Sequence, residues 1–359
     1  MVKPVPGDGR GARAIGRGGR PILVTGAGGF LGTVLTELLL AEGFSVVAHD
    51  LFPNEPAENT TALSELTRRN SDLTVVRGDL RELGADLLAD VSAVAHLAGL
   101  SNDASCEFDA AWSREINHEA TVRLGQLCAE RGGVHLVFAS SCSVYGASDT
   151  DVLCEESELG PLSIYAETKR DSEQELLALT CSGLGVICLR MGTLFGASPK
   201  MRFDLVPNQM ALTAIQEGVV RVGGGGRQWR PLLHVEEAAR VFVAALQRPN
   251  LGTRGSVLNV VGENHQIAGL GEIVGDALGV RVETMEGSQD PRSYRVSGAS
   301  LNRAMNLIPA PRTRTGVEEV AELLSRGEFG DPQQDRYYPV RTAEKLYRGL
   351  SSRECRSRA

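Results

Sequence analysis

The chain has 359 residues, of which 42% are hydrophobic and 23% are charged, and its formal net charge is −8. These values are typical of a globular protein with one large domain and a smaller lobe. The negative charge argues against a nucleic-acid partner, because phosphates would be repelled. No apolar run approaches the roughly 18 residues of a membrane span, so we expect no membrane partner.

Residues 1–20 contain six glycines and four arginines but no apolar segment of the kind found in a secretory signal. We expect a flexible basic leader outside the fold. The seven cysteines form no C-x-x-C pair, which suits buried thiols in a reducing compartment, and we expect a cytoplasmic protein. The six histidines are scattered, and we expect no metal site.

From residue 21 the sequence alternates short β-rich runs with segments of helical periodicity. The expected helices are 30–42, 107–131 and 163–181. The expected strands are 21–26, 45–50, 73–79, 93–99, 135–141 and 186–192. Apolar strands that alternate with helices predict an α/β fold, a Rossmann-type doubly wound parallel sheet.

The alternation weakens after Gly196 and indicates a second, discontinuous lobe. We predict a Rossmann domain over 21–195, to which 230–262 returns through another strand near 256–263. The smaller C-terminal lobe is then made of 196–229 and 263–335. The last segment, 336–359, is rich in arginine and is expected to be a loosely held tail.

A glycine-rich turn follows the first expected strand in the stretch TGAGGFLG. Its glycines at 26, 29 and 32 permit a tight turn, a close backbone approach to pyrophosphate and a helix N-terminus aimed at it. Asp50 ends the second strand, 18 residues after Gly32, where a carboxylate can accept hydrogen bonds from adenosine ribose. With no arginine nearby to hold a 2′-phosphate, the expected cofactor is NAD. The expected loop contacts are Gly26, Gly29, Phe30, Leu31 and Gly32.

A candidate catalytic pair occurs in SIYAETKRD, where Tyr165 and Lys169 are four residues apart and share one helix face. A tyrosine needs a nearby cation to act as a base at neutral pH, and Lys169 can supply it. Ser141 ends the strand in FASSCSVYG, where it could hydrogen-bond the reacting oxygen. Ser140 and Ser143 are alternatives for that role.

Together these motifs resemble the extended short-chain dehydrogenases/reductases, in the NAD-dependent nucleotide-sugar epimerase/dehydratase group. The resemblance rests on TGAGGFLG, Asp50, GDL (78–80), HLAG (96–99), SSCSVYG, Tyr165 with Lys169, and RPLLHVEEAA (230–239), in this order. It covers about residues 21 to 335. It implies a Rossmann domain that holds NAD and a smaller lobe that holds a nucleoside-diphosphate sugar. A homodimer formed through the helices near 107–131 and 163–181 is a further expectation of the resemblance.

Position by position, the resemblance implies a catalytic set of Ser141, Tyr165 and Lys169, with Asn117 helping to order the site through water. Further cofactor contacts are expected at Asp79, Leu80, Ala98, Gly99 and Ser140. The expected substrate contacts are Ser141, Ser143, Asn208, Arg230 and one or both of Arg292 and Arg295. Arginine suits a diphosphate through its bidentate fork.

The chain departs from the 4,6-dehydratases of this group directly after the catalytic hydroxyl. Those enzymes carry an Asp-Glu pair there, whereas this chain has Cys142 and Ser143, which disfavours dehydration. Thr193 also stands where many relatives have asparagine. Because Asp50 favours NAD(H), we expect C4 epimerisation of a nucleoside-diphosphate hexose through a 4-keto intermediate. The alternatives are a 4-ketoreductase of deoxysugar biosynthesis and, less favoured, a non-catalytic NAD-binding sensor or scaffold.

Overall fold

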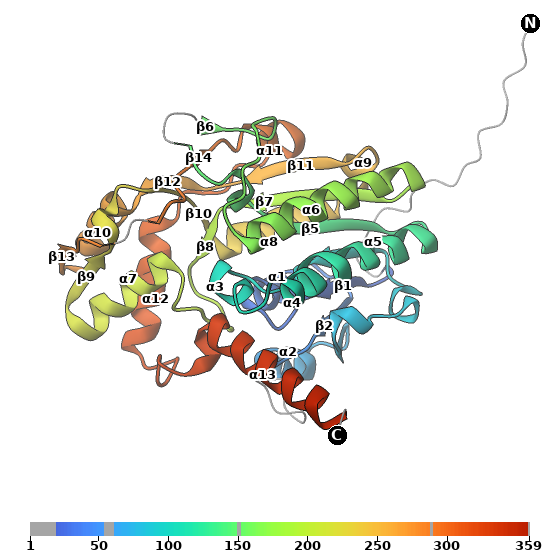
Figure 1. The fold of residues 1–359 in the computed structure, drawn as a ribbon, viewed down its shortest axis with the longest axis horizontal. Helices are drawn as coiled ribbons and strands as arrows, with labels where there is room; N and C mark the ends of the chain where they lie inside the picture. Colours follow the sequence, from blue (N-terminus) through green and yellow to red (C-terminus); the bar gives the residue numbers. More distant parts are fainter. Residues whose placement is uncertain (1–18, 54–60, 149–151, 288–289, 358–359) are drawn as a thin grey trace, which may run out of the picture.

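A seven-stranded parallel sheet forms the centre of the molecule (Figure 1). The computed structural model describes residues 19–53, 61–148, 152–287 and 290–357. In the order in which they pair, the strands are β11 (Ser256–Val260), β7 (Gly185–Met191), β5 (His135–Ser141), β4 (Ala93–His96), β1 (Ile22–Thr25), β2 (Val46–Asp50) and β3 (Leu73–Arg77). Every neighbouring pair is parallel, so the predicted doubly wound parallel sheet is confirmed.

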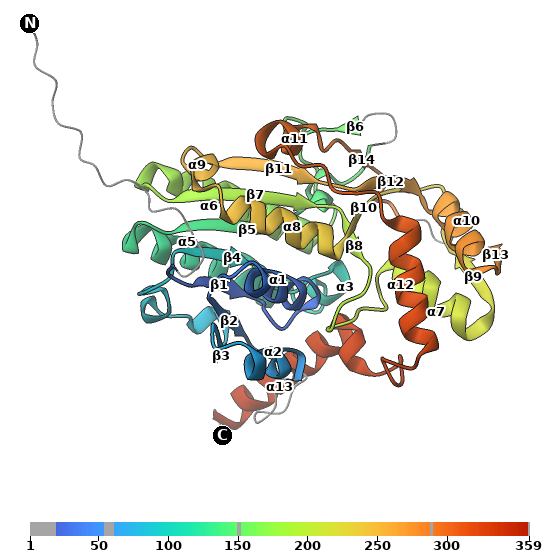
Figure 2. The same cartoon turned by 180° about the vertical axis from the view of Figure 1, so that it is seen from behind.

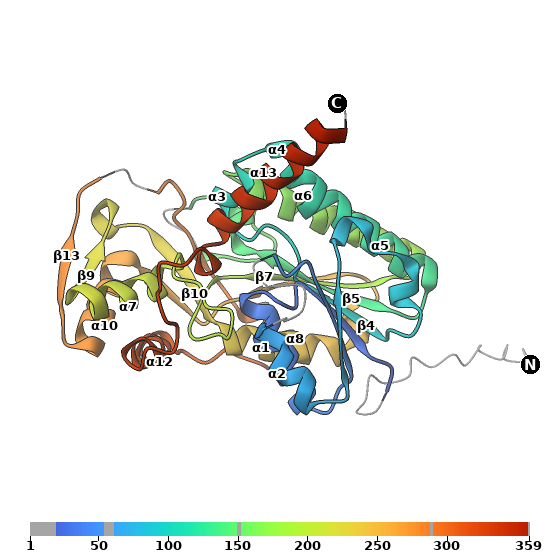
Figure 3. The ribbon, with the colours of Figure 1, turned by 90° about the horizontal axis from the view of Figure 1, so that it is seen from below.

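Helices cover both faces of this sheet, which is why its inner strands are continuously apolar. One face carries α1 (Phe30–Ala41) and α8 (Val235–Leu246), and the other carries α5 (Ala120–Arg131) and α6 (Ile164–Ala178). Figure 2 shows the first layer in front, and Figure 3 shows the two layers on opposite sides of the sheet. The short helix α2 (Thr61–Arg69) packs beside β3.

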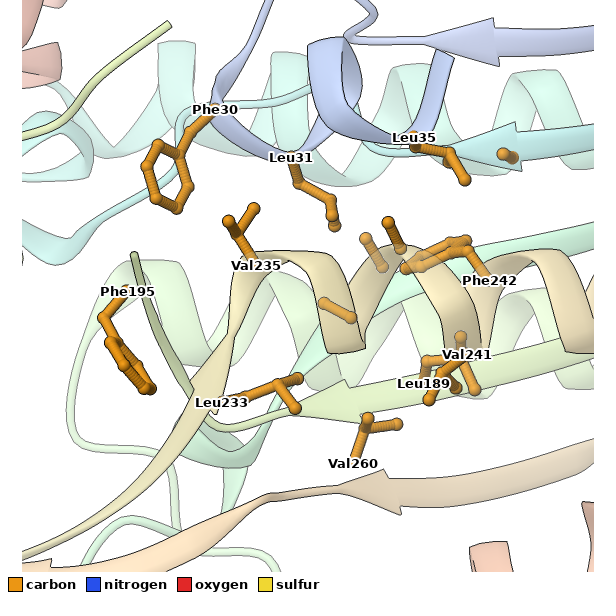
Figure 4. Close-up of a cluster of buried hydrophobic side chains, with 14 of the residues drawn as sticks. Phe30, Leu31, Leu35, Leu189, Phe195, Leu233, Val235, Val241, Phe242 and Val260 are labelled. Carbon is orange, nitrogen blue, oxygen red and sulfur yellow. The ribbon is translucent and has the colours of Figure 1, made fainter. Parts of the chain in front are cut away.

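The core between α1 and α8 is built from large apolar side chains (Figure 4). Phe30, Leu31 and Leu35 of α1 lie opposite Val235 and Phe242 of α8, and all five are at least 94% buried. The side chains of Phe30 and Leu31 therefore belong to the core. A contact of these two residues with a cofactor has to come from their backbone N–H groups at the start of α1.

The predicted helical segment 107–131 is interrupted. It consists of α4 (Ala110–Arg114), a π-helical turn (Glu115–Glu119) and then α5. A π turn inserts one residue into the helix and often occurs at functional sites. Here it carries Asn117, whose side chain is buried.

The smaller lobe lies beyond the carboxyl ends of the sheet strands (Figure 1). Its larger helices are α7 (Val206–Glu217), α10 (Ile267–Leu278) and α12 (Thr313–Ser325). Its strands are β8 (Thr193–Phe195), β9 (Val219–Val222), β10 (Trp229–His234), β12 (Glu263–Gln266) and β13 (Arg281–Thr284). Within the segment 230–262, α8 and β11 return to the main sheet, whereas β10 pairs with β8 and β12. The remaining short elements are α3 (Asp103–Cys106), α9 (Pro249–Gly252), α11 (Ala299–Met305), β6 (Val152–Leu153) and β14 (Arg295–Val296).

The C-terminal segment differs from the expected loose tail. Residues Pro339–Ser357 form a helix, α13, which packs against α3 (Figure 1). The Tyr347 ring lies 5.4 Å from that of Trp112, and its hydroxyl donates to Asp109 at 2.8 Å. The arginine-rich composition suggested a solvated tail, but the ring contact and the hydrogen bond of Tyr347 attach the helix to the first half of the chain.

Candidate active site

An open cavity of about 1950 Å³ lies at the carboxyl ends of the sheet strands, between the sheet and the smaller lobe. It exceeds the roughly 300–1,000 Å³ of a typical small-molecule pocket, so it has room for two large ligands. The carboxyl edge is where open α/β sheets bind ligands. Most of the predicted site residues line it: Gly26, Gly29, Phe30, Leu31, Gly32, Asp50, Asp79, Leu80, Ala98, Gly99, Ser140, Ser141, Ser143, Tyr165, Lys169, Arg230 and Arg292.

The glycine turn between β1 and α1 leaves no room for side chains. Gly26 has φ +74°, and a Cβ there would lie 2.6 Å from the Ala98 backbone nitrogen. A Cβ on Gly32 would lie 2.0 Å from the Gly26 carbonyl oxygen. The turn therefore exposes its backbone at the N-terminus of α1, the arrangement that accommodates a pyrophosphate.

Asp50 lines the same part of the cavity, and two backbone N–H groups hold its carboxylate in place. Its carboxylate accepts from the Gly28 N–H at 3.0 Å and from the Phe52 N–H at 2.7 Å. The Phe52 ring also occupies the space that a Cβ on Gly28 would need. The fixed carboxylate lines the cavity, and its place at the end of β2 suits hydrogen bonds from ribose hydroxyls. Gly28 was not predicted as a site residue, although it lies inside TGAGGFLG.

Asp79 follows β3 and is held by Arg81. The carboxylate accepts from the Arg81 backbone N–H at 2.9 Å and forms an ion pair with its guanidinium at 2.7 Å. Burial raises the pKa of Asp79, but the hydrogen bonds and charge of Arg81 outweigh this and hold it below its usual value. Asp79 is thus a fixed anion at the cavity edge.

Asn117 is buried behind the cavity instead of lining it. Its Oδ1 accepts from the Leu100 N–H at 2.7 Å, and its Nδ2 donates to the Leu100 carbonyl at 3.0 Å. The amide therefore clamps the loop after β4, which includes Ala98 and Gly99. In this structure Asn117 can order the site through backbone, where the resemblance implied an ordering role through water.

Helix α6 positions the candidate base. Ser163 caps its N-terminus by accepting from the Ala166 N–H at 3.2 Å, so Tyr165 lies in the first turn and Lys169 one turn later. Lys169 donates to the Ala139 carbonyl at 2.8 Å, and its ammonium lies 5.8 Å from the Tyr165 ring centre. Burial lowers the pKa of Lys169 to about 8, against the opposing charges of Cys106 and Glu173.

The tyrosine pKa differs from the expectation. Burial, followed by the charges of Asp103 and Cys106, raises the pKa of Tyr165 above its usual value. A hydrogen bond with Ser141 and the charge of Arg202 act in the opposite direction. The predicted lowering by Lys169 does not dominate, because the ammonium is bound to a strand carbonyl and the phenol is desolvated.

Ser141 and Ser143 share a hydrogen bond, with the Ser143 Oγ donating to the Ser141 Oγ at 2.9 Å. Cys142 between them points away, and its Sγ donates to the Arg190 carbonyl at 3.2 Å. Burial raises the pKa of the Cys142 thiol well above its usual value. Cys142 and Ser143 therefore supply no carboxyl group at the two positions where, by the family resemblance, 4,6-dehydratases carry an Asp-Glu pair.

A buried ion pair beneath the site was not predicted. Glu173, one turn after Lys169 on α6, pairs with Arg190 of β7 at 2.7 Å, and their side chains are 2% and 5% exposed. Ser140 donates to the same carboxylate. The i, i+4 spacing from Lys169 to Glu173 was a visible signal, but the partner Arg190 lies 17 residues further on.

Arginine–aspartate pairs form the wall contributed by the smaller lobe. Arg230 pairs with Asp290 at 2.6 Å, and Arg292 binds both oxygens of Asp290. Arg292 also forms an ion pair with Asp103, the first residue of α3. Burial raises the pKa of Asp290, but the hydrogen bonds of Arg292 and the charge of Arg230 lower it to about 2. Neither aspartate was predicted: Asp103 is 189 positions from Arg292, and Asp290, two residues before Arg292, was not singled out as its partner.

Two predicted substrate residues lie elsewhere. The Asn208 amide is used inside the smaller lobe, where it accepts from the Gly196 N–H at 2.9 Å and donates to the Arg202 carbonyl at 2.9 Å. The Arg295 guanidinium lies over the Trp229 ring, 5.1 Å from its centre, on β14 outside the cavity lining. Of the two arginines left open by the sequence, Arg292 is the one at the cavity. Thr193 also lines it.

Within the described ranges, no helix has the length and apolar character required to span a bilayer. The same part of the chain has no group of three or more His, Cys, Asp or Glu side chains arranged to hold a metal ion.

Comparison with known proteins assigns a family to this architecture. Residues 22–261 match the model described as the NAD dependent epimerase/dehydratase family. An uncharacterised UDP-glucose epimerase of Bacillus subtilis, YtcB, is 30% identical over 320 residues, which cover 85% of this chain and 98% of that protein. The UDP-glucose 4-epimerase of the same organism is 30% identical over 282 residues, covering 69% of this chain and 82% of the relative.

A solved structure shows the same likeness. MoeE5 in complex with UDP-glucuronic acid and NAD is 30% identical, with a TM-score of 0.73 over 86% of this chain and 99% of the other.

Proposed function

Because the chain belongs to the NAD-dependent epimerase/dehydratase family of enzymes, we propose that it catalyses C4 epimerisation of a nucleoside-diphosphate hexose. The observation that carries this proposal is the Ser141–Tyr165–Lys169 arrangement at the cavity, without a carboxyl group at 142 or 143. The arrangement suits removal of a proton from a sugar hydroxyl. The two adjacent positions do not suit the elimination of water.

The glycine turn and Asp50 would hold the NAD cofactor. A turn that a Cβ would block at Gly26 and Gly32 suits pyrophosphate, and Asp50 suits the adenosine ribose. Bound NAD supplies a hydride acceptor and later a hydride donor. The buried Lys169 would then face the nicotinamide ribose beside Tyr165.

The arginines of the opposite wall would bind the diphosphate of the substrate. Arg230 and Arg292 reach the cavity from separate segments of the smaller lobe and converge on Asp290. Two guanidinium groups that share one carboxylate carry more positive charge than that carboxylate neutralises. They can therefore attract a second anion, the diphosphate, to the same place.

Tyr165 would remove the proton of the C4 hydroxyl as the hydride leaves C4, and Ser141 would hold the oxygen. When the 4-keto sugar is reduced on its opposite face, Tyr165 returns the proton. The high pKa of the phenol means that the cationic Lys169 is needed to stabilise the phenolate during transfer.

The test is product analysis of purified protein with a panel of UDP-, dTDP- and GDP-hexoses. We expect NAD to be bound tightly by the purified protein and no net consumption of NAD or NADH during turnover. NMR should identify the C4 epimer as the product. Stoichiometric NADH consumption with a 4-keto-6-deoxy sugar nucleotide would instead identify a 4-ketoreductase. Binding of NAD with no conversion of any sugar nucleotide would identify a non-catalytic NAD-binding protein.

A further inference from the structure

Asp103 connects the substrate wall of the cavity to the catalytic helix. One carboxylate oxygen accepts from the Ser163 hydroxyl, which caps α6 two residues before Tyr165. The other oxygen forms the ion pair with Arg292. Asp103 itself lines the cavity, and its side chain is 23% exposed.

In the proposed function, Asp103 lies next to the place where the sugar ring binds. The diphosphate would be held at Arg292, and the reacting C4 hydroxyl would be held at Tyr165. The sugar ring has to span the space between these two groups. The Asp103 carboxylate contacts Arg292 and accepts from Ser163, two residues before Tyr165, so it lies beside the ring.

Arg292 already uses three of its five N–H groups on Asp290 and Asp103, so a diphosphate would have to share this guanidinium with two carboxylates. Its Nε and one terminal nitrogen are bound by Asp290, and its other terminal nitrogen is bound by Asp103. A diphosphate oxygen approaching that last nitrogen competes with Asp103. A partly buried carboxylate that loses a donor requires a new one, and Ser163 fills one of about four acceptor positions.

We propose that Asp103 contacts the substrate: when the diphosphate engages Arg292, the Asp103 carboxylate accepts a hydrogen bond from a sugar hydroxyl next to the reacting carbon. This rests on the proposed function and adds a specificity-determining residue to it. The hydroxyl belongs to C2, C3 or C6, because C1 carries the diphosphate and C4 reacts. The sugar must then present a free hydroxyl at that position.

The same carboxylate sets the field at Tyr165. The charged groups that face the phenol are Asp103 of α3, Arg202 of the loop before α7, and Lys169 of α6. The titratable thiol of Cys106, also on α3, stays neutral because burial raises its pKa to about 12. Further along α6, Glu167 and Asp171 are paired with Arg114 of α4. Removing the negative charge of Asp103 favours the phenolate, so the acidic limb of the kcat/KM profile should move to lower pH.

The first experiment uses wild-type holoenzyme with UDP-glucose and its 2-, 3- and 6-deoxy analogues. One analogue should lose about 10-fold to 100-fold in kcat/KM, the usual size of a hydrogen bond to a charged group. Asp103→Asn should lose a similar factor with UDP-glucose but little more with that one analogue. Dissociation constants of UDP-glucose and the deoxy analogues, measured for wild type and for Asp103→Asn, make the same comparison without turnover.

The second experiment compares Asp103→Asn with Asp109→Asn as a matched control. Asp109 caps α4 and contacts Tyr347 away from the cavity lining, so its variant should keep the wild-type pH profile and analogue pattern. Asp103→Asn should shift the acidic limb downward and leave inhibition by UDP no weaker than in wild type.

Equal losses for Asp103→Asn with UDP-glucose and with every deoxy analogue, together with an unmoved pH limb, would overturn the assignment. The proposed function fails in a different way: the wild type would then bind and convert none of the sugar nucleotides.

Discussion

Two chains of charged groups border the cavity, and they are built in opposite ways. On α6, Tyr165, Lys169 and Glu173 follow one another at i, i+4 spacing, and Glu173 pairs with the buried Arg190. On the opposite wall, Arg230, Asp290, Arg292 and Asp103 are linked by ion pairs that join residues up to 189 positions apart. We call these the helix chain and the wall chain.

The environments of the two chains differ as much as their spacing. In the helix chain the ion pair is almost completely removed from water, whereas Arg292, Asp290 and Asp103 in the wall chain are 32%, 28% and 23% exposed. Arg230 is the buried member of the wall chain, with its side chain 10% exposed, and it also donates to the Trp229 and Arg292 carbonyls. Buried charges depend on fixed partners, because losing one partner leaves an uncompensated charge in a medium of low polarity. Partly solvated pairs are weaker and can exchange partners. The helix chain therefore suits a fixed catalytic group, and the wall chain suits a ligand that must enter and leave.

The largest expected effect is at the head of the helix chain. Tyr165→Phe removes the hydroxyl that exchanges the proton and leaves the ring in place. We expect kcat to fall about 10²-fold to 10⁴-fold, the range for loss of a general acid–base group. NAD content, measured by release on denaturation, should stay at the wild-type level. Turnover within tenfold of wild type would show that another group is the base.

The base of the helix chain should matter most for stability. Glu173→Gln leaves Arg190 buried without a counter-charge, and we expect the free energy of unfolding to fall by about 3–5 kcal/mol in urea titrations. The matched control is Glu65→Gln on α2, whose ion pair with Arg69 is 63% and 72% exposed. Its effect should stay within about 0.5 kcal/mol. Similar losses in both variants would contradict the distinction between buried and solvated pairs.

The sequence predicted those parts of the molecule that local patterns determine. The seven sheet strands follow from apolar runs, and Gly26, Tyr165 and Lys169 follow from spacings within a few residues. Asp103 was missed because its partner Arg292 is 189 positions away, and no short pattern indicates that contact. Asp290 is only two residues from Arg292, but the sequence does not show that the pair also binds Arg230. Asn208 and Arg295 were expected to contact the substrate because of the family resemblance. The fold uses the first to hold backbone and places the second on an aromatic ring.

Lys169 should reduce stability in the NAD-free protein, because burial lowers its pKa from 10.5 to about 8. Below pH 8 the lysine is charged in both the folded and unfolded states, and the folded state bears the full cost of the buried cation. Between about pH 8 and 10.5 the unfolded state binds more protons, so this cost is relieved as the pH rises. Lys169→Met should therefore stabilise the NAD-free protein near pH 7, by up to about 3 kcal/mol.

The difference between wild type and Lys169→Met across pH 7 to 10 is the informative quantity. Two titratable neighbours of Lys169 stay protonated in the folded protein over this range, because burial raises the pKa of Cys106 to about 12 and that of Tyr165 above its usual value. Urea unfolding at several values from pH 7 to 10 should show the advantage of the variant shrinking as the pH rises. The absolute gain is reduced by loss of the bond to Ala139. A difference independent of pH would mean that Lys169 is not desolvated in the folded protein.

The smallest expected effect belongs to the wall chain. Asp290→Asn removes the carboxylate shared by Arg230 and Arg292, but both arginines keep other contacts: Arg230 with the Trp229 carbonyl and Arg292 with Asp103. We expect a loss of about 1 kcal/mol in the free energy of unfolding at pH 7. Because the pKa of Asp290 is lowered to about 2, this contribution is present above about pH 4 and is lost as the pH falls through 2.

Salt distinguishes the two chains further. The loss from Asp290→Asn should diminish in 1 M NaCl, where exposed charges are screened over about 3 Å, whereas the loss from Glu173→Gln should persist. If Asp290→Asn were as damaging as Glu173→Gln and equally insensitive to salt, the wall would be as rigid as the helix chain. Arg292 could then not exchange Asp103 for a diphosphate, and the coupling between substrate binding and Tyr165 would lose its physical basis.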